Sequence, residues 1–203
     1  SEVGLNDYEL TEKEKKTLEG FEELNFKEFN LTDVFDVKNT NNILSRDVIQ
    51  NSGAVPYLCA SAENNGVGSY ISYDEDYLEE GDCIFIGGKT FVVSYQEKDF
   101  FSNDSHNLAL YLKEKEKKNK LNQLFIVSCI YKSLSNKYSW GYSISNKKIQ
   151  KDKVSLPMKN DKPDYEAMEA IVSAIHKLVI KDVVLYVERK KTELSFAATQ
   201  EFQ

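Results

Sequence analysis

Two short apolar segments on either side of a glycine-rich tetrapeptide restrict the possible folds of this chain more than any other feature. Cys83–Ile86 and residues 91–94 are rich in β-branched and aromatic side chains, and the tetrapeptide 87–90 (Gly-Gly-Lys-Thr) separates them. Apolar runs of this length around a glycine pair are typical of a strand, a tight turn and a second strand. The sequence therefore predicts a β hairpin around which the rest of the chain is arranged.

Polar loops are expected before and after this hairpin. Residues 60–68 and residues 101–107 are rich in Asn, Ser and Gly, and apolar segments flank both. Together with the hairpin turn they make three small polar loops held between predicted strands. Because loops on a rigid scaffold often carry binding function, we expect them to form a surface that contacts something polar and extended.

The rest of the chain before residue 160 reads mainly as strands. Thr11 and Glu14 match a capping box for a helix that ends at Gly20. Strands are expected at 35–38, 55–60, 70–73, 108–112 and 148–157, with a one-turn helix at 31–34. Residues 124–131 are the most apolar run, and a length of eight residues fits a strand or a helix.

From residue 164 the apolar residues recur with the period of a helix. Pro163 precedes Asp164, a favourable N-cap, and one broad apolar stripe follows. The stripe consists of Tyr165, Met168, Ile171, Val172, Ile175, Leu178 and Val179. A helix of about 28 residues would span roughly 40 Å, more than one face of a small β domain requires, and a second helical stretch at 183–193 continues it. Part of this helix is therefore expected to contact a partner.

Charge is distributed unevenly along the 203 residues, whose net charge is −7. Residues 1–85 hold 6 Lys and Arg against 19 Asp and Glu, whereas residues 86–153 hold 13 against 6. Such asymmetry indicates a side that faces a polyanion. A lysine-rich solvated loop is an equal alternative, because five of the thirteen lysines fall between Lys113 and Lys120.

Membrane and secreted proteins are disfavoured. No apolar run approaches the ~20 residues of a membrane helix, and the acidic, polar N-terminus does not resemble a signal peptide. Cys59, Cys83 and Cys129 lack disulfide or zinc spacing, and their apolar neighbours predict small buried side chains. We therefore expect a cytoplasmic protein made of one domain with an appended helix.

Nucleotide and metal sites are not supported. Residues 88–90 end like a phosphate-binding loop, but Cys83 stands where that motif requires glycine, and a strand rather than a helix is predicted next. No Cys/His cluster has metal-binding spacing, and His176 is expected to be structural. His106 could act as a base beside Ser102 or Ser105, but a loop contact is favoured because a third orienting group would be needed.

The remaining polar side chains suit nucleic acid. Asn amides can pair with adenine edges and lysines with phosphates; the candidates are Asn64, Asn65, Asn103, Asn107, Lys89, Lys147, Lys148 and Lys151. Tyr138 and Tyr142 fit either the core or contact with a nucleic-acid backbone. For Trp140 core packing is favoured, because a single tryptophan is usually largely buried.

These segments together resemble the target recognition domain of the specificity (S) subunits of type I restriction-modification enzymes, or the related domain of a type II system. The likeness rests on residues 57–62 followed by Asn64-Asn65-Gly66, on 81–88, on 103–107, and on 148–157 followed by Pro163 and a long helix. It covers about residues 24–193. The order and spacing of these motifs are more specific than any one of them.

The resemblance implies an α+β fold, a mostly β target recognition domain followed by a long C-terminal helix. It implies a helical arm at 1–22, a DNA recognition domain at 23–160, and a spacer or dimerisation helix with its tail at 161–203. In such S subunits two of these units occur in tandem and their helices pair. One unit is present here, so the chain is expected to be a half subunit, a fragment, or the recognition part of a related single-chain or two-chain restriction system. A homodimer through the helix, or a second recognition domain, would complete the pair.

The resemblance also implies the partners and the site. The partners would be double-stranded DNA, a modification subunit that binds S-adenosylmethionine and methylates adenine, and a restriction subunit; the chain itself would be non-catalytic and hold no cofactor. The implied DNA contacts are Ser61, Asn64, Asn65, Gly87, Gly88, Lys89, Thr90, Ser102, Asn103, Ser105, His106, Tyr142, Lys147 and Lys148. The implied partner contacts are Met168, Ile171, Ile175 and Leu178.

Two other functions stay open at this point. The helix from residue 164 could make the chain a protein-interaction module in which any contact with DNA is incidental. Ser105 and His106 could instead serve a hydrolase.

Overall fold

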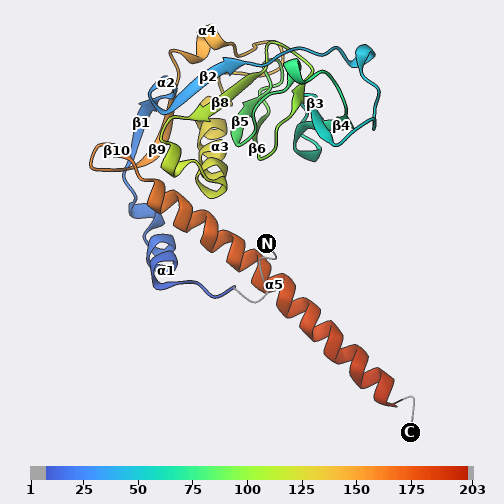
Figure 1. Cartoon of the computed structure of the whole chain (residues 1–203). Coiled ribbons are helices and arrows are strands. Elements are labelled where there is room, and N and C mark those ends of the chain that lie inside the picture. The colour runs from blue at the N-terminus through green and yellow to red at the C-terminus, as the bar shows by residue number, and fades with distance from the viewer. Residues whose placement is uncertain (1–7, 201–203) are drawn as a thin grey trace. The chain divides into compact units, whose positions relative to one another are not determined.

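The structure, a computed structural model, describes residues 8–200, and the chain divides into two compact units. One unit is Asn25–Met168, which holds all the strands, and the other combines the N-terminal segment up to Leu24 with the chain from Glu169 onward. Figure 1 shows the strands of the first unit and the long helix α5. The predicted α+β class, with a mostly β domain followed by a long helix, is confirmed.

Three small sheets build the unit Asn25–Met168 (Figure 1). The central, antiparallel sheet has the order β2 (Phe35–Asn39), β8 (Leu108–Leu112), β5 (Cys83–Ile86) and β6 (Val93–Gln96). The second has the order β4 (Val67–Ile71), β3 (Val55–Leu58) and β7 (Phe101–Ser102), with β3 parallel to β7. The third has the order β1 (Phe26–Asn30), β9 (Lys153–Lys159) and β10 (Lys162–Pro163).

Strand β5 of the central sheet is buried at every position, which explains why it is apolar throughout. In β5, Ile84 and Ile86 join the main core, to which helix α3 (Lys120–Leu134) contributes. The alternate residues Cys83 and Phe85 face the other way and pack with side chains of the second sheet, among them Leu58. Side chains of a strand point alternately to its two faces, so a strand covered on both sides must be apolar at every position.

The predicted hairpin is confirmed, because β5 pairs with β6 in antiparallel register from Cys83↔Gln96 to Ile86↔Val93. The ambiguous run 124–131 is part of helix α3, which begins after the N-cap Asn119, whose side chain accepts a hydrogen bond from the Asn122 N–H at 2.9 Å. Helix α3 packs on β9 and β6.

The strand predicted at 148–157 is wrong at both ends. Residues 146–149 form a one-turn helix, α4 (Asn146–Ile149), because the Ser145 side chain caps it by accepting from the Lys148 N–H at 3.3 Å. Strand β9 then begins at Lys153 and continues past Pro157, which pairs opposite Phe26, to Lys159.

Short helical turns connect the strands. The α-helical turn α2 (Leu31–Val34) lies where it was predicted. The 3₁₀ turns are η1 (Phe21–Glu23), η2 (Ser45–Asp47), η3 (Asn64–Gly66), η4 (Glu75–Tyr77) and η5 (Lys115–Lys117).

Helix α1 (Glu12–Glu19) packs along the part of α5 that belongs to the same unit. The predicted capping box of Thr11 and Glu14 is present, and Gly20 is the C-cap. Glu14 also accepts from Ser173 Oγ at 2.6 Å and pairs with Lys177 Nζ at 3.1 Å. Burial raises the pKa of Glu14, but these hydrogen bonds and those from Thr11 outweigh it and lower the pKa to about 2. The buried Glu14 carboxylate therefore stays charged and joins the two helices.

Helix α5 (Tyr165–Gln200) has 36 residues and a length of about 54 Å. It begins as predicted after Asp164, whose side chain accepts from the Ala167 N–H at 3.0 Å. The stretch predicted separately at 183–193 continues the same helix. No helix in the described part of the chain is long and apolar enough to cross a membrane.

The three cysteines are free thiols, and of the three only Cys83 is buried as predicted. Cys83 is fully buried, and burial raises its pKa to about 12. Cys59 and Cys129 are partly buried beside core residues, and burial also raises the pKa of each thiol. A protonated thiol is a weak nucleophile, so these residues act as small core side chains.

Candidate nucleic-acid interface

The three predicted polar loops meet at one end of the β scaffold. Asn39 and Ile86 both pair with Leu108, so β2 and β5 end where β8 begins. Leu58 of β3 pairs in parallel with Ser102 of β7, and the loops that follow these two strands therefore emerge side by side. The register of the strands thus brings together segments that are far apart in the sequence.

Asn107 joins the loop 103–107 to the hairpin turn. Its Oδ1 accepts from the Gly88 N–H at 3.0 Å, while its Nδ2 donates to Ser102 Oγ at 3.0 Å and to Asn103 Oδ1 at 3.2 Å. Thr40 Oγ1 completes the network by donating to Ser102 Oγ at 2.8 Å. Asn107 and Ser102 are buried, so their polar groups hold the loops in place.

The loop that follows β3 is fixed to the same hairpin. Thr90 Oγ1 donates to the Ala60 carbonyl at 2.9 Å, and the Asn65 side chain donates to the Tyr95 carbonyl at 3.0 Å. Asn64 and Asn65 adopt left-handed backbone conformations, with φ of 47° and 52°, which Asn tolerates better than most residues. Both Asn side chains are exposed on a loop whose backbone is fixed.

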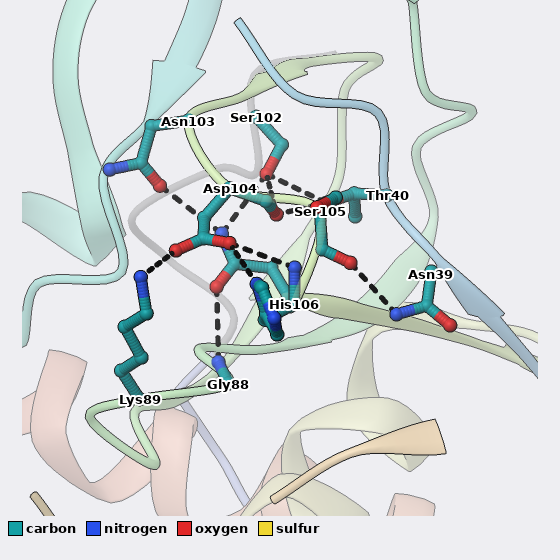
Figure 2. A network of polar contacts seen from close by, with 10 residues as sticks. Asn39, Thr40, Gly88, Lys89, Ser102, Asn103, Asp104, Ser105 and His106 are labelled. Atoms are coloured by element: carbon teal, nitrogen blue, oxygen red, sulfur yellow. Dashed lines mark hydrogen bonds and ion pairs between the residues drawn. The ribbon is translucent and has the colours of Figure 1, made fainter. Parts of the chain in front are cut away.

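Asp104 lies at the centre of the polar network in Figure 2. Its carboxylate accepts from Lys89 Nζ at 2.6 Å and from the His106 N–H at 2.9 Å, and lies 2.7 Å from His106 Nδ1. Burial raises the pKa of Asp104, but these partners outweigh it and lower the pKa to about 2. Asp104 was not predicted from the sequence, although an Asp two residues before a loop N–H is a known turn signal.

A fourth segment adjoins the hairpin through aromatic contacts. Phe91, from the loop between β5 and β6, lies 5.6 Å from the ring of Tyr138, which stacks on Tyr142 at 6.1 Å. Lys148 Nζ lies 4.0 Å from the centroid of the Tyr142 ring. Because Lys148 belongs to α4, these contacts connect α4 and the turn 139–142 to the hairpin.

Several predicted contact residues are internal. Ser102 is 0% exposed and Asn107 1% exposed, and Gly87 and Gly88 are also buried. The prediction that these residues contact DNA is therefore corrected: they shape the loops, because small or amide-bearing residues fit where two loop backbones approach closely. The prediction that Trp140 packs in the core is also wrong, since its side chain is 79% exposed.

The accessible members of the four segments form what we call the loop surface. Those that are well exposed are Asn64, Asn65, Lys89, Ser105, His106, Trp140, Tyr142 and Lys147. Those that are partly exposed are Ser61, Thr90, Asn103 and Lys148.

The lysine-rich segment 113–120 lies away from the loop surface. It follows β8, and the β2–β8 register places Phe35↔Leu112 at the opposite end from Asn39↔Leu108. Lys113 and Lys120 pair with Asp36 and Glu97 at 3.8 and 2.9 Å. The lysines of residues 86–153 therefore lie in two separate regions. Those of the segment 113–120 match the alternative of a solvated, ion-paired loop.

His106 and Ser105, the two residues considered for a hydrolase, are neighbours on the loop 103–107. His106 Nδ1 is engaged by Asp104, and Ser105 uses its backbone carbonyl to accept from Asn39 Nδ2 at 2.8 Å. Both residues are thus tied into the loop framework. No group of three or more His, Cys, Asp or Glu side chains that could hold a metal ion occurs among the residues described.

The implied partner residues on α5 fall into two groups. Met168 is 0% exposed within the main core and Ile171 is also buried, so neither can contact another molecule as predicted. Ile175 and Leu178 are exposed, and with Val179, Val183 and Tyr186 they form what we call the apolar face of α5.

Comparison with known protein families gives one match that covers most of the chain. Residues 23–185 match the family model described as type I restriction modification DNA specificity domain. Among curated proteins, the chain is 26% identical over 154 residues to the specificity subunit S.BcgI of a type II restriction enzyme from Heyndrickxia coagulans. That match covers 75% of this chain and 44% of the relative.

Solved structures show the same fold. The S subunit of a type I restriction-modification system from M. genitalium superposes with a TM-score of 0.56 at 15% identity, over 91% of this chain and 49% of that one. The HsdS subunit from Thermoanaerobacter tengcongensis gives 0.52 at 14% identity, over 88% and 45%. The chain thus spans about half the length of the relatives that it matches.

Proposed function

Because this chain belongs to the type I restriction modification DNA specificity domain family, we propose that it recognises a specific sequence in double-stranded DNA and catalyses no reaction itself. The observation that carries the proposal is the convergence of separate loops on one end of the β scaffold, where lysines and polar side chains are exposed together. A duplex offers phosphates and base edges side by side, and such a surface can contact both.

The side chains of the loop surface divide by chemistry. Lys89, Lys147 and Lys148 suit phosphates, which position a protein on the duplex without reading its sequence. Asn103 is suited to base edges, because its Oδ1 is held by Asn107 while its Nδ2 points away from that network in Figure 2. A fixed amide donor can distinguish a base edge that presents an acceptor at its position from one that presents a donor.

The proposed partners follow from the family and from the half-length match. A separate modification subunit would bind S-adenosylmethionine and methylate adenine, a restriction subunit would cleave, and this chain would read one half of a divided target in the cytoplasm. The arm would consist of residues 1–22, the recognition domain of residues 23–160, and the spacer of residues 161–203. The apolar face of α5 would pair with a second copy or with the helix of a second recognition domain.

Two substitutions on the loop surface distinguish contacts that position the protein on phosphates from contacts that read the base sequence. Lys89→Ala should weaken binding to all duplexes and reduce the salt slope by about one unit, whereas Asn103→Ala should lose about 1–3 kcal/mol of discrimination at a single base position. Fluorescence anisotropy with matched and mismatched duplexes, at several salt concentrations, measures both effects.

The matched control is Lys115→Ala, an exposed lysine in the segment 113–120. It removes the same charge away from the loop surface and should leave binding unchanged. Equal losses for Lys89→Ala and Lys115→Ala would contradict the proposal, because they would indicate attraction by net charge alone.

The exposed apolar face of α5 favours one alternative, a protein-interaction module without specific DNA binding. Sedimentation with and without duplex separates the two functions. A stable dimer whose sedimentation does not change when duplex is added would support the alternative.

A further inference from the structure

The single tryptophan of the chain stands at the tip of a tight turn. Ser139 and Tyr142 close the turn through two backbone hydrogen bonds, of 3.3 and 3.0 Å, and Gly141 adopts a left-handed φ of 95°. A Cβ atom built at Gly141 would have no other atom within 4 Å, so no other part of the described chain crowds the turn there. Trp140 is 79% exposed, although burial of such a side chain is strongly favourable.

The base of the turn is held in place while its tip is free. Tyr142 stacks on Tyr138, with an angle of 14° between the rings, and the Tyr138 hydroxyl donates to Asp152 at 2.6 Å. Lys148 Nζ lies over the Tyr142 ring and donates to the Ser143 carbonyl at 2.6 Å. Trp140 is therefore presented on a supported turn, and little conformational entropy is lost when such a group binds.

The surroundings of the turn indicate the chemistry of its ligand. Lys147 and Lys148 lie on the adjacent helix α4, whereas the carboxylate of Asp152 is buried and paired with Tyr138 and Lys137. Phe91 connects the turn to the hairpin of the loop surface through Tyr138. A flat apolar group beside lysines fits a ligand that has both anionic groups and flat aromatic faces, which nucleic acid provides.

We propose that Trp140 stacks its indole against a nucleobase of the bound duplex at the flank of the recognised site. The inference rests on the proposed function and adds to it a contact that acts through an aromatic face rather than through hydrogen bonds. Apolar side chains that enter a base step unstack it locally, and stacking on aromatic rings tolerates every base. Trp140 would therefore strengthen binding and help to deform the duplex without selecting a base.

The fluorescence of the full chain tests the inference directly, because Trp140 is the only tryptophan. The probe is the duplex recovered when the chain selects from a random pool. Binding should quench the emission of Trp140 and protect it from acrylamide. Trp140→Ala should weaken binding about tenfold, Trp140→Phe should retain most of the affinity, and the sequence preference should be the same in both variants.

The control is Phe21→Ala, which removes an exposed aromatic side chain of the other unit and should not change binding. Sequence-specific binding with unchanged emission and acrylamide access would overturn the inference and leave the proposed function intact. Failure to select any sequence would overturn both. A response of Trp140 to anionic lipid vesicles but not to duplex would assign the turn to a membrane surface and would also overturn the inference.

Discussion

Gly88→Ala is expected to abolish sequence-specific DNA binding and to destabilise the recognition unit by about 2–4 kcal/mol. A Cβ atom at this position would lie 2.2 Å from the carbonyl oxygen of His106 and 2.7 Å from its carbonyl carbon. Both are backbone atoms, so no side-chain rotation can relieve the clash. The loop 103–107 must move away from the hairpin, and the hydrogen bond between Gly88 N–H and Asn107 is then lost.

Denaturant unfolding and anisotropy with the selected duplex measure the two effects of Gly88→Ala. Gly20→Ala is the matched control, because its Cβ would lie 3.3 Å from the Lys16 carbonyl oxygen and its φ of −85° suits alanine. The control should bind DNA like the wild-type chain. If Gly88→Ala also bound normally, the close approach of the hairpin turn to the loop 103–107 would not matter for recognition.

The double substitution Leu178→Glu with Val179→Glu is expected to weaken self-association of the chain at least about 100-fold. Both side chains belong to the apolar face of α5, which stays exposed although α1 packs against the same helix through Ser173 and Lys177. Contiguous exposed apolar surface marks an interaction site. Placing two carboxylates inside a helix–helix contact requires their desolvation without a partner, so the pair should separate.

Analytical ultracentrifugation over a range of concentrations measures this effect. Lys181→Glu changes the net charge by the same amount at an exposed position outside the apolar face, and it should leave association unchanged. A wild-type chain that stays monomeric at every concentration would show that the apolar face of α5 does not pair with a second copy.

Much of the fold could be predicted from local patterns. The hairpin, the capping box of α1, the Asp164 N-cap of α5 and the turn-to-strand segment 31–38 all depend on neighbouring residues, and all are confirmed. Residues 124–131 could not be assigned, because an apolar run of that length fits both states. Only the packing of α3 on β9 and β6 decides it.

The site was less predictable because its geometry depends on long-range register. The polar loops were identified from composition, but burial decides which polar groups face outward. Ser102 and Asn107 look like Asn103 and Ser105 in the sequence, yet both are buried. The pairing of β3 with β7 places Ser102 inside, and Asn107 is held against the hairpin turn by the Gly88 N–H. Trp140 was wrongly predicted to pack in the core, because tryptophan side chains are usually largely buried. It lies instead on a tight turn, where its side chain is 79% exposed.

Selection from a pool of random duplexes at moderate salt tests the central claim most directly. The full wild-type chain should enrich one short motif, and Asn103→Ala should enrich the same motif with the preference relaxed at one position. Retention of the pool without enrichment of any motif, by a chain shown to be folded, would contradict the claim that the loop surface reads DNA sequence.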